Sequence, residues 1–320
     1  MIRTSVIMLT RNNGRTLDEV MAAIFGQRTS DEIEVVHIDS SSTDDTRTVA
    51  SRYPCRRYQI PARNFSHSAT RNYAASVSRG EFVVYVSADA TPTGPGWLER
   101  LIAPMQDPTV AGVYGRQVPR PNANVVEAYF LQRTYGAERQ LKRLGSDRRM
   151  GLGDLFFSNV TSAIRKSVWE RHPFDERLHM SEDQGWARDV LRAGHALVYE
   201  PAAAVLHSHN YTFTKLFRRN FDSGHSLAVL LRGEDINFLS YGAGYLAREL
   251  TDFARAGHAR HLPYLALYEI VRTAGFFLGR NATHLPPPAR RWCSDYTLYW
   301  DHLDAHAAPS ASRITVEQAR

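Results

Sequence analysis

The chain has 320 residues, 43% of them hydrophobic and 22% charged, a composition that supports a full hydrophobic core and excludes an intrinsically disordered protein. Its 39 Lys and Arg against 33 Asp and Glu give a formal charge of +6, which favours anionic partners such as nucleotides, phospholipids or nucleic acids without selecting among them. The only two cysteines, Cys55 and Cys293, exclude a disulfide framework and have no metal-binding spacing, so a reducing cytoplasm is the expected location.

Strands and helices alternate along the first two hundred residues. The expected strands are 5–9, 33–38, 82–86 and 196–199, and the expected helices are 16–26, 42–53, 68–78, 96–105, 125–144, 162–171 and 181–193. Thr16 with Glu19 forms a capping-box pattern at one helix start, and Ser181 with Gln184 forms another. Gly80 marks a helix end. This alternation predicts a mostly parallel, doubly wound α/β sheet, interrupted by a surface excursion over 116–157.

The pattern changes after His209, where it becomes helical almost throughout. We therefore expect an α/β core over 1–211, a C-terminal α-helical appendage over 212–305 and a loose polar tail over 306–320. The longest apolar stretch, 264–278, is interrupted by charged residues and is a poor membrane span. The first residues enter a strand pattern directly, without the apolar stretch of a secretory signal. The appendage could pack as ordinary core, form a homodimer or rest on an anionic bilayer, and the sequence leaves these alternatives open.

Polar side chains follow three of the expected strands, where the loops of a doubly wound sheet converge on one edge. They are Thr10, Arg11 and Asn12 after the first strand, Asp39 after the second and Asp89 after strand 82–86. Two carboxylates and a cation in one crevice suit a nucleotide. Asp39 could accept hydrogen bonds from a base or ribose, while Arg11 or Arg71 could meet phosphate. The ordinary alternative is that Asp39 and Asp89 only cap turns.

Two further groups carry acids and imidazoles. Glu182 and Asp183 lie in the first turn of an expected helix, where the helix dipole favours acids in any case. Trp186 shares a helix face with Asp183 and could form the wall of a sugar pocket. His207 and His209 point to the same side if their segment stays extended, although single histidines commonly have structural roles. An Asp and a His from two loops, completed by diphosphate oxygens and water, could hold Mg²⁺ or Mn²⁺.

Taken in order, these segments resemble the family 2 glycosyltransferases of the GT-A fold. The pieces are Val6-Ile7-Met8-Leu9-Thr10-Arg11-Asn12, Ile38-Asp39-Ser40-Ser41-Ser42-Thr43-Asp44, Ala69-Thr70-Arg71-Asn72, Ser87-Ala88-Asp89-Ala90, Glu182-Asp183 and His207. Within that family the chain looks most like bacterial rhamnosyltransferases of the O-antigen and cell-surface polysaccharide type. That narrower resemblance rests on Ala88-Asp89-Ala90-Thr91-Pro92, Phe157-Ser158-Asn159, Ser162-Ala163-Ile164-Arg165, Glu182-Asp183-Gln184 with Trp186-Ala187, and His207-Ser208-His209-Asn210-Tyr211. The resemblance extends to nearly the whole chain through Phe217-Arg218-Arg219, Gly279-Arg280 and Tyr299-Trp300.

The resemblance implies roles for the residues that match. Asp39 would contact the base or ribose, Arg71 the nucleotide, and Asp89 a metal that bridges the diphosphate. Asp183 would be the general base of a single inverting displacement, with Glu182 beside it. The remaining implied sites are a nucleotide-sugar site with Thr10, Arg11 and Asn12, a metal site that adds His207, and a sugar or acceptor pocket with Trp186, Asn159 and His209.

The implied reaction moves L-rhamnose from dTDP-rhamnose, or a similar sugar from dTDP or UDP, to a saccharide acceptor that is lipid-linked. Mg²⁺ or Mn²⁺ is the implied cofactor. The family's Asp-x-Asp motif has Ser87 at its first position here, as in the rhamnosyltransferase branch, and this leaves strict metal dependence open. The Gln-x-x-Arg-Trp signature of processive synthases is absent, so we expect one sugar to be added per encounter.

Two other classes of function are compatible with parts of the sequence. The first is a non-catalytic module that binds a saccharide or nucleotide within a polysaccharide assembly complex. Ser87 favours this function, whereas Asp89, Asp183 and His207 argue against it. Nucleic-acid binding is suggested only by the basic composition. The chain lacks a concentrated basic helix or an aromatic platform, so no nucleic-acid partner is expected. A glycosyltransferase of this kind would work in the cytoplasm, at the inner face of the cytoplasmic membrane if the appendage contacts the bilayer.

Overall fold

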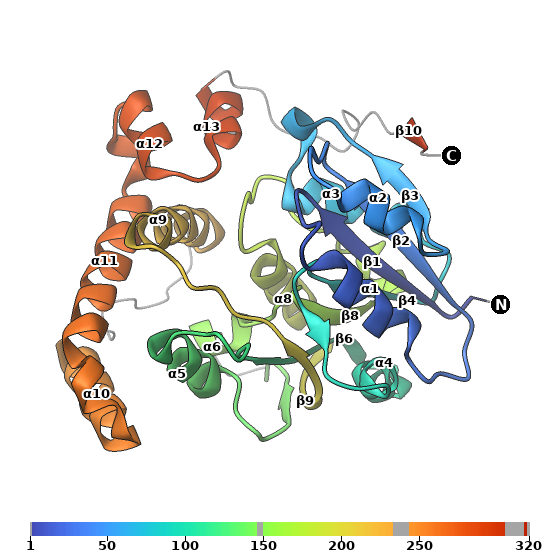
Figure 1. Ribbon diagram of the computed structural model, residues 1–320, viewed down its shortest axis with the longest axis horizontal. Coiled ribbons are helices and arrows are strands. Elements are labelled where there is room, and N and C mark those ends of the chain that lie inside the picture. The colour runs from blue at the N-terminus through green and yellow to red at the C-terminus, as the bar shows by residue number, and fades with distance from the viewer. Residues whose placement is uncertain (1, 146–149, 233–242, 305–316, 319–320) are drawn as a thin grey trace.

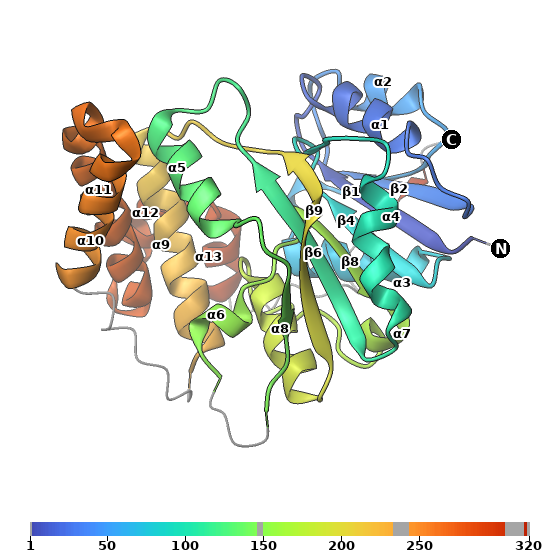
Figure 2. The same cartoon turned by 90° about the horizontal axis from the view of Figure 1, so that it is seen from below.

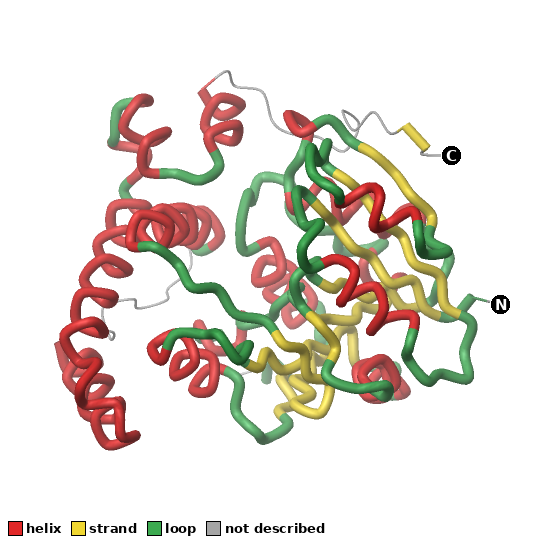
Figure 3. The backbone as a smooth tube through the Cα atoms, in the orientation of Figure 1, coloured by secondary structure: helices red, strands yellow, loops and turns green. Residues whose placement is uncertain are grey.

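One mixed sheet with helices on both faces forms the first two thirds of the protein, and a group of helices packs at its side (Figures 1 and 3). The computed structural model describes residues 2–145, 150–232, 243–304 and 317–318. The strands are β1 (Thr4–Thr10), β2 (Ile33–Asp39), β3 (Arg56–Gln59), β4 (Phe82–Val86), β5 (Thr91–Pro92), β6 (Val110–Val118), β7 (Gln140–Lys142), β8 (Thr161–Arg165), β9 (Ala196–Leu206) and β10 (Glu317–Gln318). The α-helices are α1 (Leu17–Phe25), α2 (Thr46–Ser51), α3 (His67–Val77), α4 (Trp97–Ile102), α5 (Val125–Thr134), α6 (Leu152–Leu155), α7 (Lys166–Trp169), α8 (Glu182–Arg192), α9 (Phe213–Leu230), α10 (Ala243–Phe253), α11 (Leu262–Arg280), α12 (Pro287–Cys293) and α13 (Thr297–Asp304).

The sheet order is β10-β3-β2-β1-β4-β8-β6-β9-β5, and β7 pairs with β9. Strands β3, β2, β1 and β4 are parallel, whereas β8 lies antiparallel between β4 and β6. Because the carboxyl ends of β1, β2 and β4 meet at one edge, the loops that follow them are brought together, as expected for an α/β sheet. The predicted fold class is confirmed.

Strand β4 is buried along its whole length because helices cover both faces of the sheet. One apolar layer contains side chains of α1, α2 and α4 packed on alternate strand residues such as Val84. The opposite layer contains side chains of α3, α7 and α8 packed on the intervening residues such as Val83. This two-sided burial is the reason for the continuous apolar run of β4, which contrasts with the alternating pattern of a half-exposed strand.

Two of the expected helices are wrong over part of their length. Residues 162–165, expected as the start of a helix, lie in β8, because the gap between β4 and β6 is filled by an extended segment whose backbone pairs on both sides. The expected helix 125–144 ends at Thr134, and a short strand, β7, pairs with β9 instead. These errors share a cause, since strand pairing with distant segments overrides the local helical pattern.

The strand expected over 196–199 continues to Leu206, past Pro201. The pairing of β9 with β6 jumps from Glu200 to Ala204, so Pro201 lies in a bulge where its missing N–H breaks no ladder bond. Strand β6 was not expected from the sequence, which showed no clear period where its last residues lie.

The expected capping residues have other roles. Thr16 makes no side-chain cap, and its hydroxyl instead donates to the carbonyl oxygen of Ala88 at 2.9 Å. Ser181 precedes α8 with a φ of 58° and also makes no side-chain cap. Helix α3 ends at Val77, before Gly80. Gly80 is required by packing, because a Cβ there would lie 2.7 Å from the backbone nitrogen of Ser5.

The helical pattern expected after His209 is confirmed by α9 to α13, which lie together on one side of the sheet in both views (Figures 1 and 2). The boundaries at 211 and 305 remain predictions. Of the expected tail 306–320, only 317–318 lie within the described residues, and they form β10 beside β3. None of the helices in the described part of the chain has the length and apolar character needed to cross a bilayer.

Helices α9 and α11 approach so closely that glycine is required at their crossing. A Cβ at Gly275 would overlap the carbonyl oxygen of Phe217, and one at Gly279 would overlap that of Phe221. On the facing helix, a Cβ at Gly224 would overlap the backbone of α11. Small residues at four-residue spacing let two helix backbones pack almost in contact. The pair therefore forms a closely fitted unit beside the sheet.

Replacing Gly279 by Ala should destabilise the protein by about 3 kcal/mol, because the added methyl collides with backbone that cannot move aside as a side chain can. Gly153→Ala is the matched control: Gly153 is also helical, and a Cβ there would meet nothing within 4 Å. The control should be neutral or slightly stabilising, since Ala favours helix more than Gly does. Urea unfolding curves measure both effects, and equal midpoints for the two variants would contradict the close crossing.

Candidate functional site

The loop after β4 carries Asp89, and its backbone is held from two sides. The hydroxyl of Thr16, from the start of α1, donates to the Ala88 carbonyl. The Arg120 guanidinium donates to the Asp89 carbonyl at 3.0 Å and to the Thr91 hydroxyl at 2.8 Å. None of these bonds uses the Asp89 carboxylate, which stays available to a ligand.

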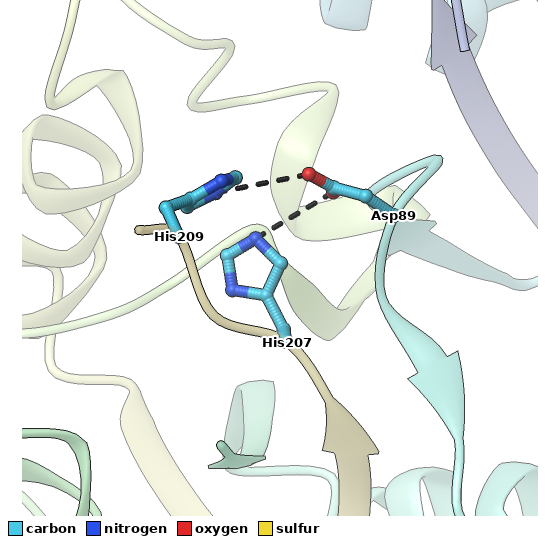
Figure 4. Close-up of side chains that lie close together, drawn as sticks. All are labelled: Asp89, His207 and His209. Carbon is cyan, nitrogen blue, oxygen red and sulfur yellow. Dashed lines mark ion pairs between the residues drawn. The ribbon is translucent and has the colours of Figure 1, made fainter. Parts of the chain in front are cut away.

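Two imidazoles face the Asp89 carboxylate across the crevice (Figure 4). His207 Nε2 lies 3.5 Å from Oδ1, and His209 Nε2 lies 3.7 Å from Oδ2. The two rings come from the segment after β9 and are 4.6 Å apart between centroids. Asp89, His207 and His209 form a group whose ligand atoms all lie within 4.8 Å of one another. The predicted pair of Asp89 and His207 is thus brought together, and His209 joins it.

The hydrogen bonds around His207 determine which of its nitrogens is free. Its Nδ1 lies 2.8 Å from the amide oxygen of Gln117, an acceptor, so Nδ1 must carry the proton. The Gln117 amide is oriented in turn by donating to the hydroxyls of Tyr135 and Ser158. Burial lowers the pKa of His207 to about 4, so the ring is neutral at pH 7. The Nε2 lone pair therefore points toward Asp89.

This donor set fits a hard divalent cation. A carboxylate and two imidazole nitrogens can bind Mn²⁺, and Mg²⁺ accepts the carboxylate readily. Adjacent ligands of an octahedral ion with bonds of about 2.1 Å are about 3 Å apart, slightly closer than Asp89 and the two rings are here. Gln117 behind His207 is the type of outer partner that fixes a metal-binding imidazole.

A second group, of two acids and a cation, lies at the start of α8. Glu182 forms an ion pair with Arg71 of α3 in which both side chains are largely buried. Asp183 accepts hydrogen bonds from the backbone N–H of Asn159 at 3.1 Å and of Gln184 at 2.9 Å. The Asn159 side chain reaches Glu182 as well, so one residue from the segment before β8 contacts both acids.

The two carboxyls have opposite pKa shifts. Burial and, after it, the negative charge of Glu182 together raise the pKa of Asp183 to about 7, against the weaker lowering by Arg71. Burial also acts on Glu182, but the charges of Arg71 and His67 outweigh it and hold the pKa of Glu182 below its usual value. Glu182 is therefore the ionised member of the pair, and Asp183 can gain or lose a proton near pH 7.

Two adjoining cavities connect these groups. One of about 260 Å³ lies over the ends of β1 and β4 and is lined by Thr10, Arg11, Arg71 and Asp89 among others. The other, of about 620 Å³, is lined by Asp89, Asp183, His207 and His209 among others. The cavities share five lining residues, His67, Arg71, Ser87, Asp89 and Asn159. Both groups thus face one continuous crevice, in which a ligand can contact Asp89 and Asp183 together.

Two predicted nucleotide residues do not line either cavity. Asp39 is only 2% exposed, and its carboxylate accepts bonds from the hydroxyls of Thr10 and Ser42 and from the Ser42 backbone. Asn12 has a φ of 56°, and its side chain accepts the Thr43 N–H. Both residues fix the loops after β1 and β2, and for Asp39 this agrees with the turn-capping alternative. Direct contact of either with a nucleotide stays a prediction.

The predicted role of Trp186 as a pocket wall is wrong in this structure. Trp186 is 1% exposed and packs between Phe157 and Phe174 in the core. Its ring also fills the space above Gly112, where a Cβ would lie 2.8 Å from it. Trp186 shares a helix with Asp183, but the side of α8 that carries it faces the sheet. Asn159 and His209, the other two pocket residues, do line the larger cavity.

Sequence reasoning missed several side chains of the crevice. Gln117 and Arg120 lie in and after β6, a strand without a clear sequence signal. Arg219 of α9 belongs to a segment that carries the family resemblance and to the expected helical appendage, but the sequence assigned it no role in the crevice. Arg219 lines the larger cavity, and its guanidinium lies 5.6 Å from the centre of the Tyr211 ring. Only folding brings this cation from the helical region to the crevice at the edge of the sheet, so the sequence alone could not assign it there.

Comparisons with known proteins agree with these observations. Residues 5–172 match the family model described as glycosyl transferase family 2. The chain is 31% identical over 303 residues to the O-antigen chain rhamnosyltransferase WbaN of Salmonella anatum, covering 93% of this chain and 96% of that protein. It is 28% identical over 307 residues to the O-antigen chain rhamnosyltransferase RfbN of Salmonella typhimurium, covering 94% and 97%.

Solved structures show the same fold. The mannosyltransferase PcManGT from Pyrobaculum calidifontis, solved in complex with GDP-Man and Mn²⁺, superposes with a TM-score of 0.59 at 20% identity. The superposition covers 88% of this chain and 86% of that one. The first 349 residues of TarS from S. aureus superpose with a TM-score of 0.55 at 16% identity, covering 88% and 91%.

Removing a ligand of the Asp89 group should weaken Mn²⁺ binding, measured by electron paramagnetic resonance titration in the presence of dTDP. Asp89→Asn and His207→Ala should each lower the affinity at least about tenfold, and Gln117→Ala should do so by about tenfold because the His207 ring loses its orientation. His195→Ala, outside the crevice, is the control and should bind like wild type. Unchanged titrations for Asp89→Asn would exclude Asp89 as a ligand.

Proposed function

Because the chain belongs to glycosyl transferase family 2, we propose that it moves L-rhamnose from dTDP-rhamnose to a saccharide acceptor with inversion at the anomeric carbon, adding one sugar per encounter. The sugar is suggested by the two O-antigen chain rhamnosyltransferases that match along nearly the whole chain. The dTDP carrier and a lipid-linked acceptor follow from the family resemblance of the sequence. Bacterial surface polysaccharide synthesis is the process in which such a reaction would serve.

The observation that carries this proposal is one crevice lined by two chemically different groups. Asp89 and its two imidazoles are suited to hold a diphosphate through a divalent ion. Asp183, with a pKa of about 7, lines the same crevice and is suited to receive a proton. A sugar nucleotide bound with its diphosphate near Asp89 would present its anomeric carbon to an acceptor activated by Asp183.

In the proposed reaction Asp183 acts as the general base. An acceptor hydroxyl transfers its proton to the Asp183 carboxylate while its oxygen forms a bond to the anomeric carbon. The bond from that carbon to the diphosphate oxygen breaks on the opposite side, and the electron pair leaves with the nucleoside diphosphate. Attack from the opposite side inverts the configuration, through a transition state with oxocarbenium character.

Other side chains of the crevice would position the donor and balance its charge. Arg71 lines both cavities, and its pairing with Glu182 keeps the guanidinium fixed beside the crevice. Arg11 lines the smaller cavity, where a phosphate would meet it, and Arg219 adds a cation from α9. A divalent ion held by Asp89, His207 and His209 would supply charge neutralisation at the departing diphosphate.

The donor is tested by incubating the protein with Mn²⁺ and a panel of dTDP-, UDP- and GDP-sugars, with binding and nucleoside diphosphate release measured separately. We expect dTDP-rhamnose to bind and to release dTDP when a saccharide acceptor is added. The anomeric configuration of the product, read by NMR, tests inversion. Release from another dTDP- or UDP-sugar alone would reassign the donor, and no binding of any sugar nucleotide would contradict the proposal.

Asp183→Asn should lower the turnover number by about 10²- to 10⁴-fold, the usual contribution of a positioned general base, while donor affinity stays close to wild type. The matched control is Asp189→Asn on the same helix, because Asp189 forms a surface ion pair with Arg188 outside the crevice. Control turnover should be unchanged. Near-normal turnover of Asp183→Asn would show that Asp183 stabilises the start of α8 and does not act in catalysis.

The rate should rise with pH through about 7, because Asp183 must lose its proton before it can accept one from the acceptor. Glu182→Gln should move this rising limb to lower pH, since removing the negative neighbour lowers the pKa of Asp183 and leaves Arg71 to stabilise its carboxylate. The pH dependence of kcat, measured for the wild type and for Glu182→Gln, gives the position of the rising limb in each protein. A rising limb at the same pH in both proteins would show that another group limits the rate.

A further inference from the structure

Helix α11 exposes an apolar face over residues 263–277. It packs on α9 through Leu265, Tyr268, Gly275 and Gly279, which are buried. The opposite, exposed side of its residues 263–277 is formed by Pro263, Tyr264, Leu267, Ile270, Thr273, Ala274 and Phe277. The structure describes every residue of this helix, and none of these seven is charged. We call this surface the α11 face.

The side chains of the α11 face are well exposed. Ile270 is 63% exposed, and Leu267 and Phe277 are 45% exposed each. A helix that borders water normally places its charged residues on the outer side. On α11 the two charged residues within the same span do the reverse: Glu269 is buried and accepts a bond of 2.6 Å from Arg272, whose guanidinium lies over the Phe130 ring. The solvent-exposed side of α11 is therefore its apolar side.

Cations and an aromatic ring lie on the segments that precede and follow α11. Arg255 and Arg260 are exposed on the short π-helical (Ala254–His258) and 3₁₀-helical (Ala259–His261) segments between α10 and α11. After α11, Trp292 of α12 is 67% exposed, and its ring lies 6.4 Å from that of Phe217 and 6.0 Å from the guanidinium of Arg218. Exposed Trp and Arg at the edge of an apolar surface are typical of segments that lie at a bilayer interface.

We propose that the α11 face is a membrane-docking surface that lies on an anionic lipid bilayer. The exposed positions run along about 21 Å of helix, enough for α11 to lie in the bilayer plane with its apolar side in the acyl boundary. Figures 1 and 2 both show α10 and α11 at the edge of the molecule farthest from β1 and β2, so the surface can reach a plane without obstruction by the sheet.

Charge favours a bilayer over a second copy of the chain as the occupant. Arg255 and Arg260 complement anionic headgroups, as does the overall charge of +6. A second copy would present the same cations to this surface. If the proposed function holds, a lipid-linked acceptor would reach the crevice from the bilayer beside α9, whose Arg219 lines the larger cavity.

The proposal is tested by flotation of the full chain with vesicles of phosphatidylcholine alone or mixed with phosphatidylglycerol. We expect flotation with the anionic vesicles and less at high salt. Ile270→Ser and Phe277→Ser should each lower the vesicle partition coefficient at least about tenfold, because each removes an inserted apolar side chain without changing the charge. Arg255→Gln and Arg260→Gln should each lower it about fivefold.

Leu141→Ser is the matched control. Leu141 is 60% exposed on β7, so the same change is made at an apolar side chain outside the α11 face. It should float like wild type. Trp292→Ser provides a second exposed test site, and thermal unfolding of every variant checks that the fold is intact.

Three outcomes would overturn the proposal. They are no flotation of the wild type, equal flotation of Ile270→Ser and wild type, and a wild-type dimer that Ile270→Ser converts to monomer without any flotation. The last would identify the face as a contact between copies. Binding of dTDP by the same samples is measured in parallel, so failure of the proposed sugar transfer and failure of membrane docking are recognised separately.

Discussion

The buried ion pair between Arg71 and Glu182 links the sheet, α3 and α8, and the chemistry of the crevice depends on it. Arg71 also lies 5.8 Å from the centre of the Tyr85 ring of β4, whose hydroxyl donates to the Arg71 carbonyl. Removing one partner of such a pair leaves an uncompensated charge and costs about 3 to 5 kcal/mol. Because Glu182 stays ionised, the neighbouring Asp183 is the carboxyl that exchanges a proton near pH 7. One arrangement thus gives a structural ion pair and, beside it, a carboxyl with a pKa of about 7.

The Asp89 group shows a similar division between residues that face the crevice and residues that hold them. Thr16 and Arg120 bind the main chain around Asp89 and leave its carboxylate free. Gln117 fixes the proton of His207 on Nδ1, so that the other nitrogen is available. The supporting residues come from α1 and from β6 and the loop after it. The loop that carries Asp89 is in this way held by side chains of elements distant in the sequence.

The helical group and the sheet meet around the same crevice. Glycines at the α9–α11 crossing bring the two helices into backbone contact, which fixes α9 as the wall that carries Arg219. The same crossing turns the other side of α11 outward. Since Glu269 and Arg272 pair on the inner side, the outer side of residues 263–277 exposes only apolar and neutral residues. The orientation of the docking surface and that of the crevice wall therefore follow from one packing constraint.

The sequence by itself determined the strands β1, β2 and β4, the polar residues that follow them and the family, because buried runs, turn residues and short motifs are local signals. The tertiary structure decided what depends on distant partners. Residues 161–165 became a strand because β4 and β6 flank them. Trp186 became core because Gly112 leaves room for its ring. The pKa of Asp183 reached about 7 because burial and the charge of Glu182 act together in the folded crevice. Neither the extent of this burial nor the opposing effect of Arg71 can be inferred from the residues next to Asp183 in the sequence.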